Sequence, residues 1–487
     1  MHRINVITEQ ALHNAKATRQ IEQALQARLP PHTLMQRAGL AVARLSLAIS
    51  PHSQRIWIAC GPGNNGGDGL EAAMHLQQWG KKPLVTWLGN PDTVPRDAAT
   101  AYLKAHQAGV EFSDTPPSHF DFCIDALLGL GGGRRPLADR MSEWAAVMND
   151  SHAPVLAIDL PTGLCADTGV VIPNHVKATH TLSLLTLKPG LFTASARDTT
   201  GEIWLDPLCS GIETSQFLPP LEATALLAAA PNPVPRLQAS HKGSYGDVAV
   251  IGGANGMTGA ALLAASAALN SGAGRVFVGL LADPSINVNP DQPELMFRRV
   301  DDMDLTSATV VCGCGGGDAI QAHMQRLLMA AIQVVIDADA INSIASSTSF
   351  QSLLTSRSRQ SKSTVLTPHP LEAARLLGIT TAEVQNDRLS AATALAQRFG
   401  CTIVLKGSGT IVARQGQTPV INSTGNAKLA TAGTGDVLAG MIGAGLASGL
   451  PEFEAACRAV YHHGWLADCW PRDAPLTAYQ LAQGGPQ

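Results

Sequence analysis

Residues 55–69 read RIWIACGPGNNGGDG, and this stretch decides the fold of the first half of the chain. An apolar run at residues 56–59 stops at a loop rich in glycine and asparagine, and a helix is expected to begin near Leu70. Gly61, Gly63 and Gly66 satisfy the GxGxxG pattern, in which glycines let backbone N–H groups approach a phosphate at a helix N-terminus. The pattern alone is weak, because a tight structural turn accounts for many of its occurrences.

The side chains of this loop separate it from a dehydrogenase fingerprint. The next apolar run, residues 84–88, ends in Gly89 and Asn90, where that fingerprint would place an acidic residue to hold a ribose. Asn65 and Asp68 instead add side-chain oxygen atoms to the backbone donors. This mixture suits a site that holds an anionic ligand and a hard cation together.

Short apolar runs alternate with helix-length segments on both sides of a proline-rich stretch. Strands separated in this way predict βαβ units and mostly parallel sheets. The expected strands are residues 56–59, 84–88, 122–128, 155–158 and 181–187, then 248–252, 276–280, 310–312, 334–337, 365–367 and 403–405. We therefore expect an α/β domain at residues 1–218, a proline-rich linker at 219–240 and a second α/β domain at 241–487.

Three helices are expected outside this alternation. Thr8 is placed as the N-cap of a first helix that ends before Pro30, and Thr33 as the N-cap of a second helix with one apolar face. The run at residues 221–229, between the prolines of the linker, is expected to be a short helix.

The composition excludes several classes of protein. Of the 487 residues 45% are hydrophobic and 15% charged, which is typical of folded domains rather than disordered chains. Lys and Arg number 34 against 38 Asp and Glu, so the chain offers no basic surface for nucleic acid. Residues 437–450 are apolar but too short to cross a membrane and are expected to form a buried helix. Nine scattered cysteines and an N-terminus without an apolar signal core favour the cytoplasm.

Two expected strand ends of the first domain carry carboxylates. Asp125 begins the string DALLG, and Asp159 begins the string DLPTG. Because the carboxyl ends of parallel strands meet at one edge of a sheet, both are expected to converge with the glycine-rich loop on one crevice. The alternative is that each aspartate only caps the helix that follows it.

A glycine-rich turn in the second domain resembles a site of phosphoryl transfer. Residues 432–436 read AGTGD at an expected helix start, so backbone amides can hold developing negative charge and Asp436 can orient or deprotonate a hydroxyl. The turn lacks the GK[ST] of a Walker loop. A plain helix cap is the alternative, and the string LKGSGT at residues 405–410 of the same domain counts against it.

The strings GNNGGDG, DALLG, DLPTG and LKPGL together resemble the NAD(P)H-hydrate epimerase family. The resemblance implies a Rossmann-like three-layer domain that interconverts the R and S epimers of hydrated NAD(P)H. It implies a potassium ion held by Asn65, Asp125 and Thr162, where the family often has serine in place of the threonine. Contacts to the hydrated dinucleotide would come from Asn64, Asn65, Gly66, Gly67, Asp68, Gly129, Leu130, Gly131, Gly132, Gly133, Arg134, Arg135 and Asp159.

Epimerisation at a carbon that bears a hydroxyl beside a ring nitrogen can proceed by loss and return of the hydroxyl. This chemistry needs a carboxylate acid or base near the carbon and a site that tolerates a cationic intermediate. Asp159 is the candidate for the proton transfer. The two arginines that follow the glycines, Arg134 and Arg135, either meet a phosphate or end a solvated loop.

The strings GGANGMTGA, TPHPLE, LKGSGT and AGTGD resemble the ribokinase-like, ADP-dependent NAD(P)H-hydrate dehydratases. The resemblance implies that ADP phosphorylates the hydroxyl of the S epimer, after which phosphate is eliminated; Mg²⁺ is expected to assist. The residues implied for ADP are Lys406, Gly407, Ser408, Gly409, Thr410 and Gly435, and those for the hydrated substrate are Ala260, Gly315, His369 and Asp436. Cys314 stands where the family usually has proline, and His462 and His463 are expected to pack within a helix.

These observations favour a bifunctional repair enzyme with Asp159 and Asp436 as its catalytic residues. A ribokinase-like kinase for a small alcohol and a nucleotide-binding regulatory module with inactive sites are the alternatives. The expected partners are hydrated NADH or NADPH, ADP and further copies of the chain, with neither nucleic acid nor membrane.

Overall fold

The computed structural model describes residues 1–5, 8–133, 135–209, 222–233, 235–282 and 287–484. The chain divides into two compact units at Ala225 and Leu226. The first contains Met1–Asn5 and Gln10–Ala225, and the second begins its main part at Leu226. Arg134 and the residues of the expected linker at 219–221 and 234 lie outside the described residues.

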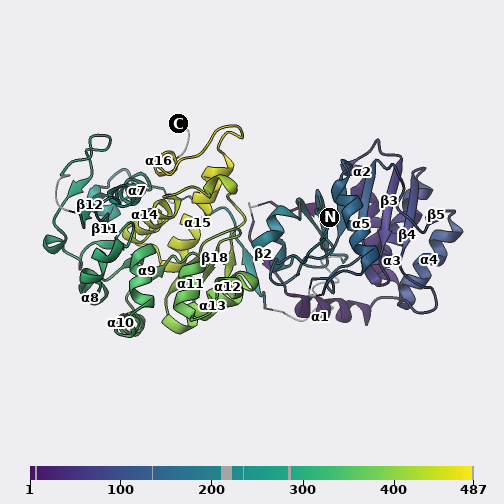
Figure 1. Cartoon of the computed structure of the whole chain (residues 1–487), viewed down its shortest axis with the longest axis horizontal. Helices are drawn as coiled ribbons and strands as arrows, with labels where there is room; N and C mark the ends of the chain where they lie inside the picture. The colour runs from purple at the N-terminus through teal and green to yellow at the C-terminus, as the bar shows by residue number, and fades with distance from the viewer. Residues whose placement is uncertain (6–7, 134, 210–221, 234, 283–286, 485–487) are drawn as a thin grey trace. The chain divides into compact units, whose positions relative to one another are not determined.

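The first unit is a mixed sequence of helices and strands in which η marks a 3-10 helix (Figure 1). In chain order its elements are β1 (His2–Arg3), β2 (Gln10–Leu12), α1 (Ala15–Gln26), α2 (Thr33–Ile49), β3 (Arg55–Cys60), α3 (Asn64–Gln78), β4 (Lys82–Trp87), α4 (Arg96–Gln107), β5 (Glu111–Ser113), β6 (Phe122–Ala126), α5 (Asp139–Asp150), β7 (Val155–Ile158), β8 (His180–Leu184), η1 (Pro189–Leu191), η2 (Ala194–Asp198) and β9 (Glu202–Asp206).

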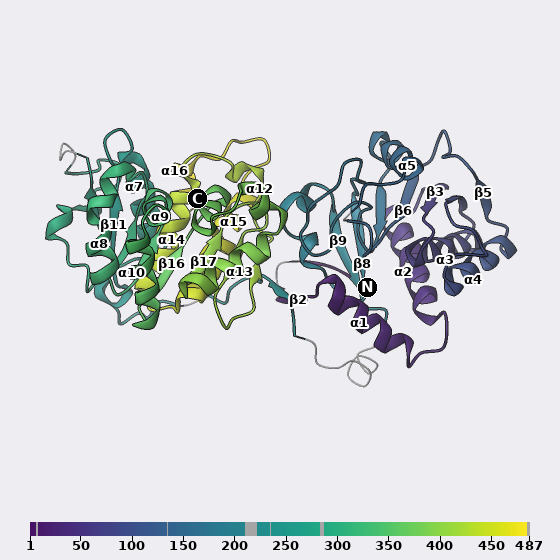
Figure 2. The ribbon, with the colours of Figure 1, turned by 60° about the horizontal axis from the view of Figure 1, so that its bottom comes forward.

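Its sheet has the order β1-β9-β8-β7-β6-β3-β4-β5, and β1 is the strand that runs antiparallel to its neighbour. Alternate residues of β3 face two separate cores. Ile56 and Ile58 pack toward α2 and α3, whereas Trp57 and Ala59 pack toward α5. Figure 2 shows α5 on one side of the sheet and α2 and α3 on the other. The expected Rossmann-like three-layer α/β organisation is confirmed.

The second unit contains the longer series of elements. These are β10 (Ala225–Leu227), η3 (Lys242–Tyr245), β11 (Asp247–Gly252), α7 (Thr258–Asn270), β12 (Arg275–Leu280), β13 (Met296–Phe297), η4 (Val300–Asp302), β14 (Thr309–Cys312), η5 (Gly317–Ile320), α8 (Gln321–Ala330), β15 (Val334–Ile336), α9 (Ala338–Ala345), α10 (Thr348–Arg359), β16 (Thr364–Leu366), α11 (Pro370–Leu377), α12 (Thr381–Asn386), α13 (Arg388–Phe399), β17 (Thr402–Leu405), β18 (Ile411–Ala413), β19 (Val420–Ile421), η6 (Ala427–Leu429), α14 (Thr434–Ala447), α15 (Glu452–Asp468) and α16 (Ala478–Ala482).

Its sheet runs β13-β12-β11-β14-β15-β16-β17-β18-β19-β10. The strands from β13 to β17 are parallel, and β18 is antiparallel to both of its neighbours. Helices α7, α14 and α15 pack on one face against residues such as Val250 and Val311, and alternate residues such as Ile251 are buried on the other face. A parallel sheet covered on both faces is the arrangement expected of the ribokinase-like domain.

One expected helix begins later than predicted, and another is replaced by a strand. Residues 10–12 form β2, whose Leu12 bridges to Leu187, and α1 begins only at Ala15, where the Asn14 side chain accepts from the N–H of Ala17. The described part of the run at 221–229 contains the strand β10, which pairs with β19, rather than a helix. In both places a pairing partner far away in the sequence overrides the local preference.

Other expectations are confirmed. The second expected helix is present as α2, but Thr33 is its first helical residue and His32 its N-cap, so the expected N-cap was wrong by one residue. Residues 437–447 lie in the buried helix α14 as expected. Six of the cysteines are buried. Among the described residues, no helix combines the length and the apolar character that a membrane crossing requires.

Candidate functional site

The order of the first sheet reverses at β3, because β4 lies on one side of it and β6 on the other. Ligands of open α/β sheets bind at such a reversal, outside the carboxyl ends of the strands. The glycine-rich loop follows β3, and α3 begins at Asn64 directly after it. A Cβ at Gly61 would lie 1.9 Å from the carbonyl oxygen of Leu127, so only glycine lets this loop pack against the loop after β6.

Asp125 lies at the end of β6 and is fully buried. Its carboxylate accepts from the backbone N–H of Thr162 at 2.8 Å, from the Thr162 hydroxyl at 2.7 Å and from the N–H of Leu127 at 3.2 Å. Burial raises the pKa of Asp125 to about 6, and the bonds from Thr162 oppose that rise. The aspartate therefore ties two loops together and does more than cap a following helix.

Asp159 follows β7 with a backbone φ of 66°, in the left-handed region that few non-glycine residues adopt. Its carboxylate forms an ion pair with the Nζ of Lys188, which is fully buried and also donates to the Ser183 hydroxyl at 3.1 Å and to the Leu184 carbonyl at 2.8 Å. Lys188 belongs to the string LKPGL, for which the sequence indicated no role. The lysine holds the candidate catalytic carboxylate in one place.

Lys188→Met is expected to lower the free energy of unfolding of the first unit by about 3–5 kcal/mol, because it leaves the Asp159 charge buried without its partner. Differential scanning calorimetry would show this as a lower transition temperature. The exposed Lys177 provides the control, since Lys177→Met removes the same charge at the surface. An equal shift in both variants would contradict a special role for the buried pair.

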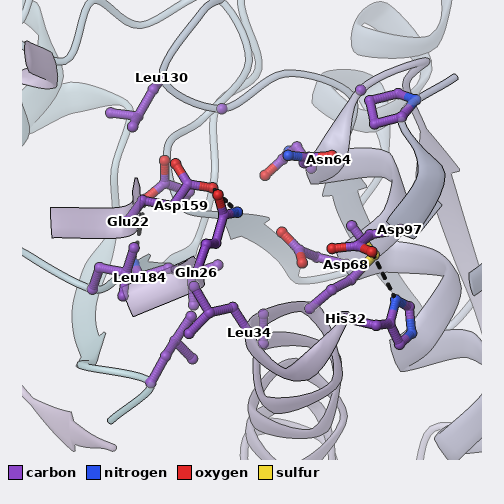
Figure 3. Close-up of a pocket in the computed structure, with 18 of the residues that line it drawn as sticks. Glu22, Gln26, His32, Leu34, Asn64, Asp68, Asp97, Leu130, Asp159 and Leu184 are labelled. Atoms are coloured by element: carbon purple, nitrogen blue, oxygen red, sulfur yellow. Dashed lines mark hydrogen bonds and ion pairs between the residues drawn. The ribbon is translucent and has the colours of Figure 1, made fainter. Parts of the chain in front are cut away.

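A cavity of about 650 Å³ opens between these elements (Figure 3). Gly129 lies within it between two expected site residues: a Cβ there would be 3.2 Å from Asn65 Oδ1 and 3.3 Å from Asp159 Oδ2. The expected residues that line the cavity are Asn64, Asn65, Asp68, Gly129, Leu130, Gly131 and Asp159. The structure therefore brings the first loop, the loop after β6 and Asp159 to one place.

Several expected residues do not line this cavity. Gly67 packs against α2, where a Cβ would lie 2.5 Å from Met35 Cε, and Gly133 packs against the backbone of Cys165. Gly66, Gly132 and Arg135 are likewise outside the set of described residues that line it, and Arg134 is not described. Their expected contact with the dinucleotide stays a prediction. The structure gives Gly67 a role in packing α3 against α2 and Gly133 a role in packing its loop against Cys165.

The cavity is acidic. Besides Asp159 it is lined by Asp68 of α3, Asp97 of α4 and Glu22 of α1. Burial raises the pKa of Asp68 well above its ordinary value, and the neighbouring carboxylates of Asp159 and Glu22 add to the rise. The Asp68 carboxyl is therefore harder to ionise than that of an exposed aspartate.

Helix α1 and the start of α2 contribute residues to the cavity that the sequence did not indicate. Those on α1 are Thr18, Arg19, Glu22 and Gln26. Next to them His32 pairs with the buried Glu71, which also accepts from Lys104 Nζ at 3.0 Å. These α1 residues carry no local motif, so only the packing of the helix shows that they line the cavity.

The second sheet also reverses, at β11, between β12 and β14. The loops after β11 and β14 join there through the N–H of Gly253, which donates to the Cys314 carbonyl at 2.9 Å, and that of Ala254, which donates to the Gly315 carbonyl at 2.7 Å. A Cβ at Gly315 would lie 2.8 Å from Ala260 Cβ. Two residues expected to contact the hydrated substrate are therefore neighbours.

Asp436 lies in the first turn of α14, after Gly433 with a φ of 91°. Its carboxylate, that of Asp337 and the sulfur of Cys314 lie within 4.8 Å of one another. Burial raises the pKa of Asp436 to about 7, and the charge of Asp337 contributes to the rise. Burial and the two carboxylates raise the pKa of the Cys314 thiol well above its ordinary value, so it stays protonated and unreactive.

Lys406 points into this cluster. Its Nζ lies 2.6 Å from Asp337 Oδ1, and a Cβ at Gly435 would be 3.4 Å from the same nitrogen. Asp337 also accepts from the Thr367 hydroxyl at 2.7 Å. Asp337 was not among the expected residues, although it directly follows the strand β15 as Asp159 follows β7.

His369 lies at the N-cap of α11 and bonds through Nδ1 to the backbone N–H groups of Leu371 and Glu372. Burial raises the pKa of Glu372 to about 7, against the opposing charge of Lys406. Burial lowers the pKa of His369, and Lys406 lowers it further, so the imidazole is neutral at pH 7. The helix cap holds a neutral histidine close to the cluster.

The remaining expected residues, Gly407, Ser408, Gly409 and Thr410, form the loop between β17 and β18. The Thr410 hydroxyl donates to the Gly407 carbonyl at 3.0 Å, which closes the loop on itself. Contact with ADP stays a prediction for this loop. His463 is buried and bonds through Nε2 to the Thr434 carbonyl, which fits the expected packing role.

The residues around Asp436 do not fit a resident Mg²⁺ ion. Mg²⁺ requires oxygen ligands in octahedral geometry, whereas Cys314 offers sulfur and Lys406 already neutralises Asp337. Among the described residues, Cys314, Asp337 and Asp436 form the one group of three or more potential metal ligands that lie close together.

The two folds and their sites define the class of the protein as a two-domain α/β enzyme. One domain offers a cavity lined by four carboxyl residues at a Rossmann-like sheet edge. The other offers a helix N-terminus with a carboxylate and a lysine, the groups that phosphoryl transfer uses.

Comparison with known proteins agrees with this division. Residues 31–190 match the family described as YjeF-related protein N-terminus, and residues 248–483 match the family described as NAD(P)H-hydrate dehydratase. A bifunctional NAD(P)H-hydrate repair enzyme of Coxiella burnetii is 36% identical over 472 residues, which cover 94% of each chain. The chain belongs to the family of bifunctional NAD(P)H-hydrate repair enzymes.

Two further relatives cover the second domain. An ADP-dependent (S)-NAD(P)H-hydrate dehydratase of Neisseria meningitidis is 43% identical over 254 residues, which cover 51% of this chain and 84% of that one. A crystal structure of an ADP/ATP-dependent NAD(P)H-hydrate dehydratase from Bacillus subtilis aligns with this chain at 30% sequence identity and a TM-score of 0.43. The alignment covers 51% of this chain and 91% of that chain.

Proposed function

We propose that the chain repairs hydrated NADH and NADPH in two steps. The domain at residues 1–218 interconverts the R and S epimers, and the domain at 241–487 dehydrates the S epimer with ADP, releasing AMP and phosphate. The proposal rests on one observation: each unit has a candidate catalytic aspartate at its site. Asp159 lines the cavity of the first unit, and Asp436 lies at the start of α14 in the second. We also expect a homo-oligomer in the cytoplasm that binds small molecules alone.

In the first step the residues of the cavity move protons. Lys188 keeps the Asp159 carboxylate oriented, and that carboxylate takes the proton of the water that adds to the ring. The negative charge of Asp159, which lines the cavity, stabilises the positive charge that develops on the ring when the hydroxyl leaves. The contacts of Asn64, Asn65 and Asp68 would position the hydrated dinucleotide.

The residues proposed for a potassium ion fit that ion. Asp125 and Thr162 supply buried carboxylate and hydroxyl oxygens, and the buried side-chain amide nitrogen of Asn65 has no hydrogen-bond partner among the described residues. Because the oxygen and nitrogen of an amide can be exchanged by rotation, Asn65 can present its oxygen there. A bound potassium ion would supply positive charge beside the anionic dinucleotide.

Replacing potassium by tetramethylammonium in the buffer is expected to slow epimerisation at least about tenfold. The exchange of the R and S epimers followed by chromatography provides the measurement. Asp125→Asn removes the one charged ligand, so its remaining activity should no longer respond to potassium. An identical response in wild type and Asp125→Asn would contradict the assignment of Asp125.

In the second step Asp436 takes the proton of the substrate hydroxyl as that oxygen attacks the terminal phosphorus of ADP. The P–O bond to AMP breaks, and backbone N–H groups at the start of α14 hold the negative charge of the transferred group. The ring nitrogen then donates its electron pair, the C–O bond breaks, and phosphate leaves. The adjacent ring carbon then loses a proton, which the departing phosphate can accept; its C–H electron pair forms the ring C=C bond and the nitrogen regains its own pair. Phosphate is a much better leaving group than hydroxide, which explains why a kinase-like site can serve a dehydration.

The proposal is tested with a mixture of both epimers of hydrated NADH. With ADP, the purified chain should convert the whole mixture to NADH, measured by absorbance, and release AMP. A stable phosphorylated product would instead indicate a small-molecule kinase. Binding of ADP without recovery of NADH would indicate a regulatory module.

A further inference from the structure

Helix α1 places a second carboxyl group beside Asp159. Glu22 lines the cavity from α1, and Figure 3 shows it on the side of the cavity where Asp159 lies, with Asn64 and Asp68 on the other side. Residues 31–190 match the family model of the first domain, so α1 lies outside the matched segment. Nothing in the sequence motifs pointed to Glu22.

Two hydrogen bonds of α1 fix the helix, and with it Glu22, next to the Asp159–Lys188 pair. The Thr18 hydroxyl bonds to that of Thr186 at 2.8 Å, in the segment that leads to Lys188. At the start of the helix the N–H of Ala15 donates to Asp167 Oδ1 at 2.7 Å. The helix is therefore anchored to the same loops that orient Asp159.

The two carboxyl groups lie in different environments. Asp159 pairs with the ammonium of Lys188 and accepts from the N–H of Leu184 at 3.3 Å. Burial raises the pKa of Glu22, the Asp159 carboxylate raises it further, and the charges of Lys188 and Arg19 oppose the rise. Two carboxyls whose environments separate them in this way divide into a base and an acid.

We propose that Glu22 is the proton donor of the epimerase site and works as a pair with Asp159. The inference rests on the epimerase activity proposed above. Glu22 gives its proton to the ring hydroxyl, the C–O bond breaks as the ring nitrogen donates its electron pair, and water leaves. Water then adds to the other face of the same carbon, the electron pair returns to nitrogen, and the extra proton passes to the Asp159 carboxylate. Transfer of that proton from Asp159 to Glu22 restores both groups.

The test compares Glu22→Gln and Glu22→Asp with wild type, using each separated epimer of hydrated NADH. Glu22→Gln should lower kcat for epimerisation about 100-fold or more, with KM changed less than about threefold, because it removes a proton donor and keeps the size of the side chain. Glu22→Asp should restore at least about a tenth of the wild-type kcat. The exposed Lys16 on the same helix gives the control Lys16→Gln, which should match wild type.

The outcomes separate this inference from the function it rests on. If wild type fails to interconvert the epimers, the proposed epimerase function fails, whatever Glu22 does. If wild type is active and Glu22→Gln retains its kcat, Glu22 is not the proton donor. Loss of activity in both Glu22 variants together with a KM raised more than about tenfold would overturn the inference in favour of a structural role for α1.

Discussion

Asp159→Asn is expected to slow interconversion of the R and S epimers about 10³-fold, while ADP-dependent dehydration of the pure S epimer stays at the wild-type rate. The amide cannot take up the proton that the carboxylate accepts, and general acid–base catalysis of this kind contributes about 10²–10⁴-fold. Chromatographic separation of the epimers after timed incubation gives the first rate, and recovery of NADH absorbance gives the second.

The substitution also removes the countercharge of the buried Lys188, so a change in stability has to be separated from a change in chemistry. Asp159→Asn combined with Lys188→Met removes both charges and should restore stability without restoring epimerisation. Asp150→Asn, at the exposed end of α5, is the control for loss of a negative charge in the same unit. Epimerisation at the wild-type rate in Asp159→Asn would remove Asp159 from the mechanism.

The sequence predicted the strands that are buried on both faces, because such strands appear as short, continuous apolar runs. All eleven expected strands are present, with ends displaced by one to a few residues. It did not predict β18, β19 or β10, which are two or three residues long and depend on pairing with distant segments. Strands of that length carry too little periodicity to be distinguished from loops.

The sites were predictable where a chemical group follows a strand or starts a helix. Asp125, Asp159 and Asp436 were found in this way, and Asp337 could have been, since it follows the apolar run at 334–336. Glu22 and Lys188 could not, because their importance comes from packing between α1, β7 and the loop after β8 rather than from a local pattern. A single lysine or glutamate in a sequence is ordinarily solvated, and only burial shows otherwise.

Asp436→Asn is expected to lower ADP-dependent dehydration about 10³-fold and to leave epimerisation unchanged. The carboxylate is the group placed to take the hydroxyl proton, and its neighbours Asp337 and Lys406 already form a pair with each other. Dehydration of the purified S epimer with saturating ADP provides the measurement. Asp473→Asn, an exposed aspartate of the same unit, should have no effect.

The pH dependence of the wild-type reaction tests the same residue independently. Burial raises the pKa of Asp436 to about 7, and a base works in its ionised form. The rate of dehydration should therefore rise with pH between about 6 and about 8 and level off above that range, and it should fall about tenfold per unit at lower pH. Asp436→Asn should lose this limb of the profile, because its side chain does not titrate.

Glu372 has a pKa raised to about 7 as well, so Glu372→Gln serves as the comparison. If the limb persists in Asp436→Asn and disappears in Glu372→Gln, the base of the second site is Glu372.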